Sequence, residues 1–342
     1  MNRHGPMQEL PPITWLLPVR NGMPYLPLTL ESIAEQTYSN HKIIAWDNGS
    51  HDGTVEELRR WIPGKIPGIV IAGTPMRLGP SLGAMVQLAD TELCARMDGD
   101  DINVADRLER QVTFMLEHPS VGVLGGQLDL IDEENRKLPS ADWSYATDDA
   151  SIRWLLRWRN QLAHNAVMFR RSVVLAAGNY RDTQPFEDLD LWQRASYLTE
   201  MSNLPEVLVH YRRMTSTSTG AIKNFLPTDR AAAKLNASIL FPGIEPTGRV
   251  MSLWEATHPY QLDLASKYRH VKELEQAALL LAQKVGKPSN YFTDTETFKD
   301  QRFRLRRRFF KRMKLMPLVR LRDHLRMPKV RVEGEAQSRL IT

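Results

Sequence analysis

The sequence predicts an α/β protein built around a mainly parallel sheet. Short apolar stretches alternate with segments of helical spacing in the first part of the chain, and they span 13–19, 42–46, 69–72 and 93–97. Strands that alternate with helices form βαβ units, which build parallel sheets. Polar clusters directly follow three of the strands, at 20–21, 47–48 and 98–101. Open α/β sheets bind ligands at the carboxyl ends of their strands, so this coincidence predicts a ligand site.

Apolar residues at helical spacing mark the segment after each of the first three strands. Residues three or four apart share one face of a helix, so each set predicts a helix that packs on the sheet. The sets are Leu26, Leu30 and Ile33 after the first strand, Val55, Leu58 and Trp61 after the second, and the apolar residues of 82–88 after the third. Polar residues and glycines between them mark the turns.

Beyond the fourth strand the pattern continues with longer helices and isolated strands. An amphipathic helix is predicted at 104–117, and the polar stretch 132–150 is loop-like. The other expected elements are strands at 121–125, 165–169 and 207–211, a helix at 152–158 and a helix that begins within 185–192. After residue 220 an alanine-, leucine- and lysine-rich pattern, interrupted by prolines, predicts further helices.

The composition is that of a globular protein, with 42% hydrophobic and 25% charged residues among 342. The sequence shows no run of about 18 apolar residues and no N-terminal signal peptide, so we expect a chain that is neither exported nor membrane-spanning. The single cysteine, Cys94, excludes an internal disulfide framework and favours a reducing, cytoplasmic compartment. Its apolar neighbours predict a buried core thiol.

The acidic stretch Arg96-Met97-Asp98-Gly99-Asp100-Asp101 carries the strongest chemical signal in the chain. Its carboxylates follow an apolar strand, so they stand at the edge of the predicted sheet. Hard oxygen ligands suit Mg²⁺ or Mn²⁺, and such ions usually hold substrates through phosphates. A solvated acidic turn is the alternative interpretation, and Asp101 could instead cap the following helix.

Seven motifs in order resemble those of the inverting family 2 glycosyltransferases, especially bacterial enzymes that build surface polysaccharides. They are LPVRNG at 17–22, WDNGSHDGT at 46–54, ARMDGDD at 95–101, RLERQ at 107–111, HP at 118–119, HNAVMFRR at 164–171 and FEDLDLW at 186–192. The similarity covers roughly 12–218 and leaves 220–342 uncovered. It implies a GT-A fold, in which a Rossmann-like nucleotide-binding half joins an acceptor-binding half.

The resemblance implies transfer of a sugar from a nucleotide-diphosphate donor, usually a UDP-sugar, to a hydroxyl of a glycan or lipid-linked acceptor. It also implies a role for each matching position. Pro18, Arg20 and Asn21 line the nucleotide pocket, Asp47 hydrogen-bonds the base, Asp98 faces the ribose or sugar, and Asp100 holds Mn²⁺ or Mg²⁺ on the diphosphate. Asp188 matches the general base, with Glu187 as its supporting neighbour. Turn formation by Asp47 and a helix-dipole role for the Glu187-Asp188 pair are the structural alternatives.

Two departures from the family pattern concern the diphosphate. The segment 79–85 lacks the arginine that relatives often place before the acidic strand, and Arg77 is our candidate substitute. Relatives also often follow Tyr-Arg with a histidine that completes the site, whereas Met214 follows Tyr211-Arg212-Arg213 here. Metal dependence is therefore expected to differ, with Arg212 or Arg213 neutralising phosphate.

The C-terminal segment 301–331 contains thirteen lysines or arginines and one acid, interleaved with phenylalanines and leucines. A polybasic amphipathic stretch is attracted to anionic lipid by about 1 kcal/mol per cation near the surface. We expect it to hold the protein at the inner face of the membrane; a solvated tail is the alternative. No nucleic-acid-binding module accompanies the charge, so no nucleic-acid partner is expected.

These observations divide the chain into a tail at 1–11, a GT-A glycosyltransferase domain at 12–220, a helical extension at 221–300 and a basic tail at 301–342. A non-catalytic nucleotide-sugar-binding protein or membrane scaffold is the alternative function. A nucleotidyltransferase would need a glycine-rich phosphate loop after the first strand, and 18–22 is not one.

Overall fold

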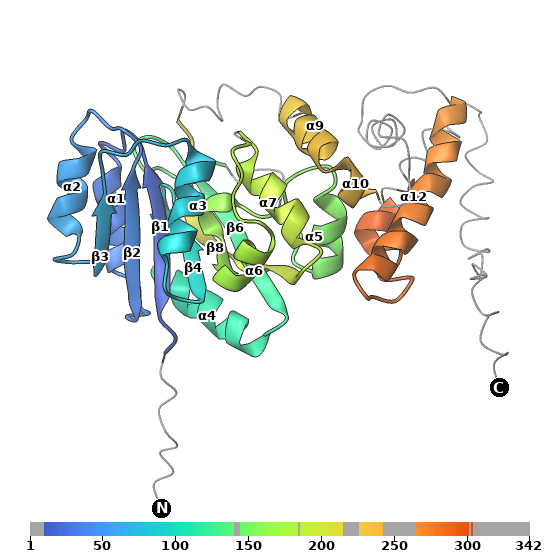
Figure 1. Cartoon of the computed structure of the whole chain (residues 1–342), viewed down its shortest axis with the longest axis horizontal. Helices are drawn as coiled ribbons and strands as arrows, with labels where there is room; N and C mark the ends of the chain where they lie inside the picture. Colours follow the sequence, from blue (N-terminus) through green and yellow to red (C-terminus); the bar gives the residue numbers. More distant parts are fainter. Residues whose placement is uncertain are drawn as a thin grey trace, which may run out of the picture.

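An eight-stranded mixed sheet forms the centre of the protein (Figure 1). The computed structural model describes residues 10–139, 144–183, 185–214, 226–241, 264–300 and 302–303, without the side chains of 226–229 and 264–271. The strands are β1 (Ile13–Val19), β2 (His41–Asp47), β3 (Gly68–Ile71), β4 (Leu93–Arg96), β5 (Ile102–Asn103), β6 (Val121–Ile131), β7 (Met168–Arg170) and β8 (Glu200–Arg212). Their order across the sheet is β3-β2-β1-β4-β7-β6-β8-β5.

The half of the sheet formed by the first four strands is entirely parallel. β1 pairs with both β2 and β4, and Val19 lies opposite Asp47 while Leu16 lies opposite Arg96. β7 then runs antiparallel between β4 and β6, β6 and β8 are parallel, and β5 is antiparallel to β8. The predicted α/β class with a mainly parallel sheet is confirmed.

Helices cover both faces of this sheet (Figure 1). In chain order they are α1 (Leu26–Ala34), α2 (Thr54–Trp61), α3 (Leu78–Leu88), α4 (Arg107–Glu117), α5 (Asp149–Leu155), the 3₁₀ helix η1 (His164–Ala166), α6 (Arg171–Ala176), α7 (Glu187–Ala195), α9 (Leu226–Leu235), α10 (Ala237–Leu240) and α12 (Leu264–Lys284). Trp15 and Leu17 of β1 pack with α1, α2 and α4 on one face, and Leu16 packs with α3, α6 and α7 on the other. Both faces are buried, as parallel sheets require, and Cys94 is indeed buried.

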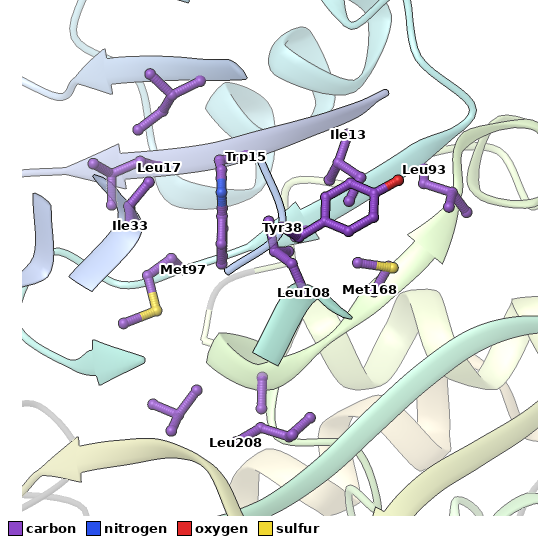
Figure 2. Packing of buried hydrophobic residues seen from close by; sticks show 14 of the residues in the cluster. Ile13, Trp15, Leu17, Ile33, Tyr38, Leu93, Met97, Leu108, Met168 and Leu208 are labelled. Carbon is purple, nitrogen blue, oxygen red and sulfur yellow. The ribbon is translucent and has the colours of Figure 1, made fainter. Parts of the chain in front are cut away.

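Figure 2 shows the first of these cores, where side chains from distant parts of the chain meet around Trp15. Leu17 and Ile33 come from β1 and α1, while Leu108 comes from α4 and Leu208 from β8. Trp15, Leu17, Ile33, Leu108 and Leu208 are all completely buried. This core fixes the position of β1, and therefore of the loop that follows it at the carboxyl edge.

The segment predicted as a strand at 165–169 is only partly one. Residues His164–Ala166 form η1, and the strand β7 begins at Met168. Side chains of α4 occupy the carbonyls that a strand would offer to a neighbour: Arg107 Nη1 donates to the oxygen of Asn165 (2.8 Å) and Gln111 Nε2 to that of Ala166 (2.9 Å). The apolar pattern carried no sign of these long-range bonds.

Some other strands and helices are longer than predicted, and two were not predicted at all. β6 and β8 are longer than the predicted 121–125 and 207–211, because they pair with each other along most of their lengths. The helix predicted at 152–158 begins at Asp149, since the side chain of Asp148 accepts a hydrogen bond from the Ser151 amide (2.8 Å). β5 and α6 were not predicted, because both are short and lack a clear period.

The C-terminal helices share a third core with α5. Trp154 and Trp158 contact Phe241, Phe292 and Phe298 from the segment beyond residue 226. The predicted domain boundary at 220 lies outside the described residues, as does the basic tail apart from 302–303 and the N-terminal tail before residue 10. Within the part of the chain that the structure describes, no helix is long and apolar enough to cross a membrane.

Candidate functional site

Loops after β1 and β2 are tied together at the carboxyl edge of the sheet. Asn21 adopts a left-handed conformation (φ 52°), its amide donates to Ser50 Oγ (2.8 Å), and its side-chain oxygen accepts from the His51 amide (3.0 Å). Arg20 and Asn21 are exposed, whereas Pro18 is buried inside β1. Two of the three residues predicted to line a nucleotide pocket are thus available to a ligand, and Pro18 shapes the strand beneath them.

Asp47 lies at the end of β2 and is 3% exposed. Its carboxylate accepts from the amides of Gly49 (3.2 Å) and Ser50 (3.2 Å), so it closes the turn that carries the Asn21 contacts. Asp47 therefore forms a turn, which was the structural alternative to a role in nucleotide binding. Its contact with a nucleotide base stays a prediction.

The acidic loop after β4 packs directly against the end of β1. A Cβ added at Gly99 would lie 2.9 Å from Cγ2 of Val19, so the absence of a side chain permits this approach. Asp98 is partly exposed and forms an ion pair with Arg96, which is 2% exposed. Burial, and then the charge of Asp98, raise the pKa of Asp100 to about 6. This carboxylate is held at a site where a cation would stabilise its charged form.

Asp101 differs from its neighbours, because it is completely buried. Its carboxylate accepts from Asn165 Nδ2 (2.6 Å) and from the Arg212 amide (2.7 Å). Burial, followed by the charge of Asp100, raises the pKa of Asp101 well above its usual range. Asp101 therefore anchors the acidic loop to η1 and β8 and does not cap a helix.

Arg212 also holds the acidic loop in place. Its guanidinium donates to the carbonyls of Asp100 (2.8 Å) and Asp132 (2.7 Å) and to Asn135 Oδ1 (2.6 Å), and it lies over the ring of Tyr25 (4.2 Å). It is 1% exposed. These protein oxygens occupy its donors, so the structure gives Arg212 a supporting role where the sequence suggested phosphate neutralisation.

The predicted base lies in the first turn of α7. Asp188 accepts from Asn160 Nδ2 (2.6 Å) and from the Leu189 amide (2.7 Å), and burial raises its pKa. Glu187 is 5% exposed, and its Oε2 has no hydrogen-bond partner among the described residues. Burial, and then the charge of Asp188, raise the pKa of Glu187 to about 7. Carboxyl groups whose pKa is raised by burial are typical of functional sites.

Arg96 connects the acidic loop to the base. Its guanidinium is buried near the carboxyl groups of Asp100, Glu187 and Asp188. The positive charge lowers the pKa of each of the three and so partly offsets the effect of burial. The same charge, after burial, lowers the pKa of His164, whose Nε2 lies 3.0 Å from the hydroxyl oxygen of Tyr180. The structure thus brings Asp98, Asp100, Glu187 and Asp188 together around one cation, as the candidate site requires.

Arg77 stands at the N-terminus of α3 and is exposed. It forms an ion pair with Asp182, in the loop that precedes α7. Close packing accompanies this pair, because a Cβ at Gly79 would lie 2.3 Å from the carbonyl oxygen of Arg181. Arg77 therefore lies near the base-bearing segment, and its contact with a diphosphate remains a prediction.

The residues present fit a divalent ion held mainly by its substrate. Among the described residues no three His, Cys, Asp or Glu side chains are grouped to form a complete metal cage. Mg²⁺ and similar ions are commonly bound by one or two carboxylates together with substrate phosphates. Asp100, whose charged form is disfavoured by burial, would supply one such carboxylate.

Three residues in the region of the base were missed by the sequence reasoning. Asn160 holds Asp188, and Tyr145 lies close enough that the charge of Asp188, after burial, raises the pKa of its phenol. Arg159, beside Asn160, is exposed and also acts on Tyr145. All three fall in the weakly patterned region 130–165, where no motif points to them.

Glu187→Gln is expected to stabilise the fold at neutral and alkaline pH but not at acidic pH. In the unfolded chain the carboxyl ionises near pH 4.5, whereas in the folded protein its pKa is about 7, so wild-type stability falls as the pH rises through this window. The glutamine has no charge to bury, and we expect it to gain about 2–3 kcal/mol at pH 8 and little at pH 4.5. Thermal unfolding of both proteins at the two pH values measures this. An equal difference at both pH values contradicts the buried-acid interpretation.

Comparisons with known proteins identify the family of the chain. The family model described as glycosyl transferase family 2 matches residues 14–175. The amylovoran biosynthesis glycosyltransferase AmsE of Erwinia amylovora is 30% identical over 194 residues, which cover 54% of this chain and 68% of that protein. The fold and these matches define a GT-A glycosyltransferase. The chain belongs to glycosyl transferase family 2, and the resemblance inferred from its motifs is confirmed.

Other similar proteins extend the comparison. The O-antigen biosynthesis glycosyltransferase WbnJ of Escherichia coli is 29% identical over 198 residues, covering 55% of this chain and 74% of that protein. The crystal structure of S. aureus TarS 1–349 in complex with UDP-GlcNAc superimposes with a TM-score of 0.54 at 13% identity, over 85% of this chain and 91% of that one. At this identity the structural likeness supports the fold alone.

Proposed function

We propose that the protein is an inverting, metal-dependent glycosyltransferase that moves a sugar from a UDP-sugar to a hydroxyl of a glycan or lipid-linked acceptor in surface polysaccharide or lipopolysaccharide assembly. The observation that carries the proposal is the grouping of Asp98, Asp100, Glu187 and Asp188 around buried Arg96 at the carboxyl edge of the sheet. A relative in O-antigen biosynthesis supports the pathway class, and a relative whose name specifies a UDP-Gal donor supports a UDP-sugar.

The donor side consists of the joined loops after β1, β2 and β4. Exposed Arg20 and Asn21 receive the nucleotide, Asp47 faces the base, and Asp98 faces the ribose or sugar. Arg96 fixes the Asp98 carboxylate through their ion pair, so the latter is oriented before the donor arrives. Asp100 would hold a divalent ion, which neutralises charge on the departing diphosphate.

The acceptor side is organised around Asp188. An acceptor hydroxyl is far too weak an acid to ionise alone, so a positioned carboxylate must take its proton as the new bond forms. Asn160 and the Leu189 amide each bind one carboxylate oxygen, which fixes the direction of the group. A single displacement of the diphosphate then inverts the anomeric centre without a covalent intermediate.

The remaining finer proposals concern place and acceptor. A relative at 24% identity is a UDP-Gal:α-D-GlcNAc-diphosphoundecaprenol β-1,3-galactosyltransferase, which supports an acceptor carried on a lipid. We propose that the basic segment 301–331 brings the cytoplasmic enzyme to the anionic inner face of the membrane, where such an acceptor lies. This segment lies outside the described residues, so the proposal rests on its sequence.

Nucleotide release from a panel of UDP-, GDP- and dTDP-sugars, with and without Mn²⁺ or Mg²⁺, tests the proposed function. We expect metal-stimulated turnover of one UDP-sugar, increased by lipid-linked acceptors. Binding of a donor without turnover in the presence of these acceptors would favour the non-catalytic scaffold instead. If no nucleotide sugar binds, the proposed glycosyltransferase function is wrong.

A further inference from the structure

A residue of the C-terminal helical segment reaches the helix that carries the base. Asn236 precedes α10 and is 4% exposed. Its side-chain Nδ2 donates to Asp190 Oδ1 (3.1 Å) and to Gln193 Oε1 (2.8 Å), both on α7. Both α7 and Asn236 lie beyond the family match, which ends at residue 175. The contact joins the helical segment after residue 226 to the helix that carries the candidate base.

Asp190 is the centre of this contact. It is completely buried and shares the first turn of α7 with Asp188. Arg194 donates to its Oδ2 (2.7 Å) and also to the carbonyl of Asn179 (2.8 Å), in the loop between α6 and α7. Asn236 donates to Oδ1 (3.1 Å), and Arg181 Nη1 lies 3.5 Å from the same oxygen. A buried carboxylate with well-placed donors on both oxygens holds its helix rigidly. Because the Arg181 side chain is exposed, loss of Asn236 leaves Oδ1 with one long ion pair as its partner.

Gln193 extends the contact to the partner of the base. Because its Oε1 accepts from Asn236, its Nε2 points the other way and donates to the carbonyl of Leu156 (2.8 Å). Leu156 directly follows α5 and leads into the loop that carries Asn160, the donor to Asp188. Asn236 thus sets the orientation of the Gln193 amide, which links α7 to the segment that holds the base from its other side.

We propose that Asn236 is a positioning residue for Asp188, so that the segment 226–241 belongs to the catalytic framework. The proposal rests on the proposed function in assigning the base, but the geometry of the contact does not depend on it. Asn236 acts on the orientation of the base and touches neither the nucleotide loops nor the acidic loop. Its loss should affect turnover and leave donor binding unchanged.

Asn236→Ala in the full chain tests this proposal. Small misplacements of catalytic groups have large kinetic effects, and we expect kcat to fall about tenfold while the Kd for UDP changes less than about twofold. Amide hydrogen exchange over 187–195 should accelerate in the variant. Asn290→Ala is the matched control, because Asn290 is exposed, lies after α12, and uses its side chain only to bond Asp294 among the described residues; it should alter neither kcat nor exchange.

Gln193→Met provides a second route if Asn236→Ala folds poorly. It removes the acceptor for Asn236 and the donor to Leu156, so it should reproduce the loss of kcat, and the double variant should lose no more than either single one. Unchanged kcat and unchanged exchange in Asn236→Ala overturn the proposal, as does a matching loss of UDP binding. If the wild type neither binds nor turns over any nucleotide sugar, the proposed function fails, and hydrogen exchange still decides the positioning role.

Discussion

Asp188→Asn is expected to lower kcat by about 10²–10⁴-fold while the protein still binds UDP. The amide cannot take the proton of the acceptor hydroxyl, yet it is close to the carboxylate in shape and keeps one oxygen that can accept from Asn160. Asp188 makes no contact with the nucleotide loops in the structure, so donor affinity should change little. Steady-state nucleotide release gives kcat, and calorimetric titration with UDP gives the affinity.

The control for this variant is Asp106→Asn. Asp106 precedes α4 and forms an exposed ion pair with Arg110, away from the candidate site, so the same chemical change should leave kcat unaltered. Retention of most wild-type turnover by Asp188→Asn would show that another group accepts the proton. Glu187 is then the next candidate, because it is buried beside Asp188 and its pKa is raised to about 7.

The edge of the sheet was predictable, because it depends on local pattern. An apolar strand such as 13–19 that is followed by polar residues predicts where the chain leaves the sheet. Parallel pairing brings such strand ends together. The structure confirms that β1, β2 and β4 adjoin in this way, with Val19 opposite Asp47. The acidic cluster after the fourth strand pointed to Asp98 and Asp100, and the resemblance of the motifs to family 2 glycosyltransferases pointed to Asp188.

The framework around those residues was not predictable, because it depends on contacts between distant segments. Arg96 belongs to a motif, yet only the fold shows that its guanidinium is buried among carboxylates. Asn160 and Asn236 have no periodic or motif signal, and each acts on α7 through one side-chain amide. Arg107 likewise acts through a long-range hydrogen bond: its guanidinium binds the carbonyl of Asn165, in η1, where the sequence predicted a strand. Buried polar side chains are where sequence pattern gives the least information.

Asp100→Asn and Asp101→Asn are expected to have different effects, although the residues are adjacent: the first should lose metal-stimulated activity and the second should lose stability. Asp100 is a partly exposed carboxylate whose backbone is held by Arg212, so its replacement should leave the fold intact. It should lower metal-stimulated nucleotide release by about 10²-fold or more, because the amide carries no charge to hold the divalent ion on the diphosphate. Titration of Mn²⁺ in the release assay should show weaker or absent stimulation.

Asp101→Asn should instead destabilise the fold. Both carboxylate oxygens of Asp101 accept hydrogen bonds, from Asn165 and from the Arg212 amide, and an amide offers only one acceptor. A buried donor left unpaired costs about 1–3 kcal/mol. The melting temperature should therefore fall when it is measured at about pH 4, where the substitution relieves little buried charge. At neutral pH the folded fraction should keep its response to Mn²⁺. Normal metal stimulation in Asp100→Asn, or an unchanged melting temperature in Asp101→Asn, would reverse the assignment of the two acids. The pair therefore separates the residue that meets the ligand from the residue that holds the loop in place.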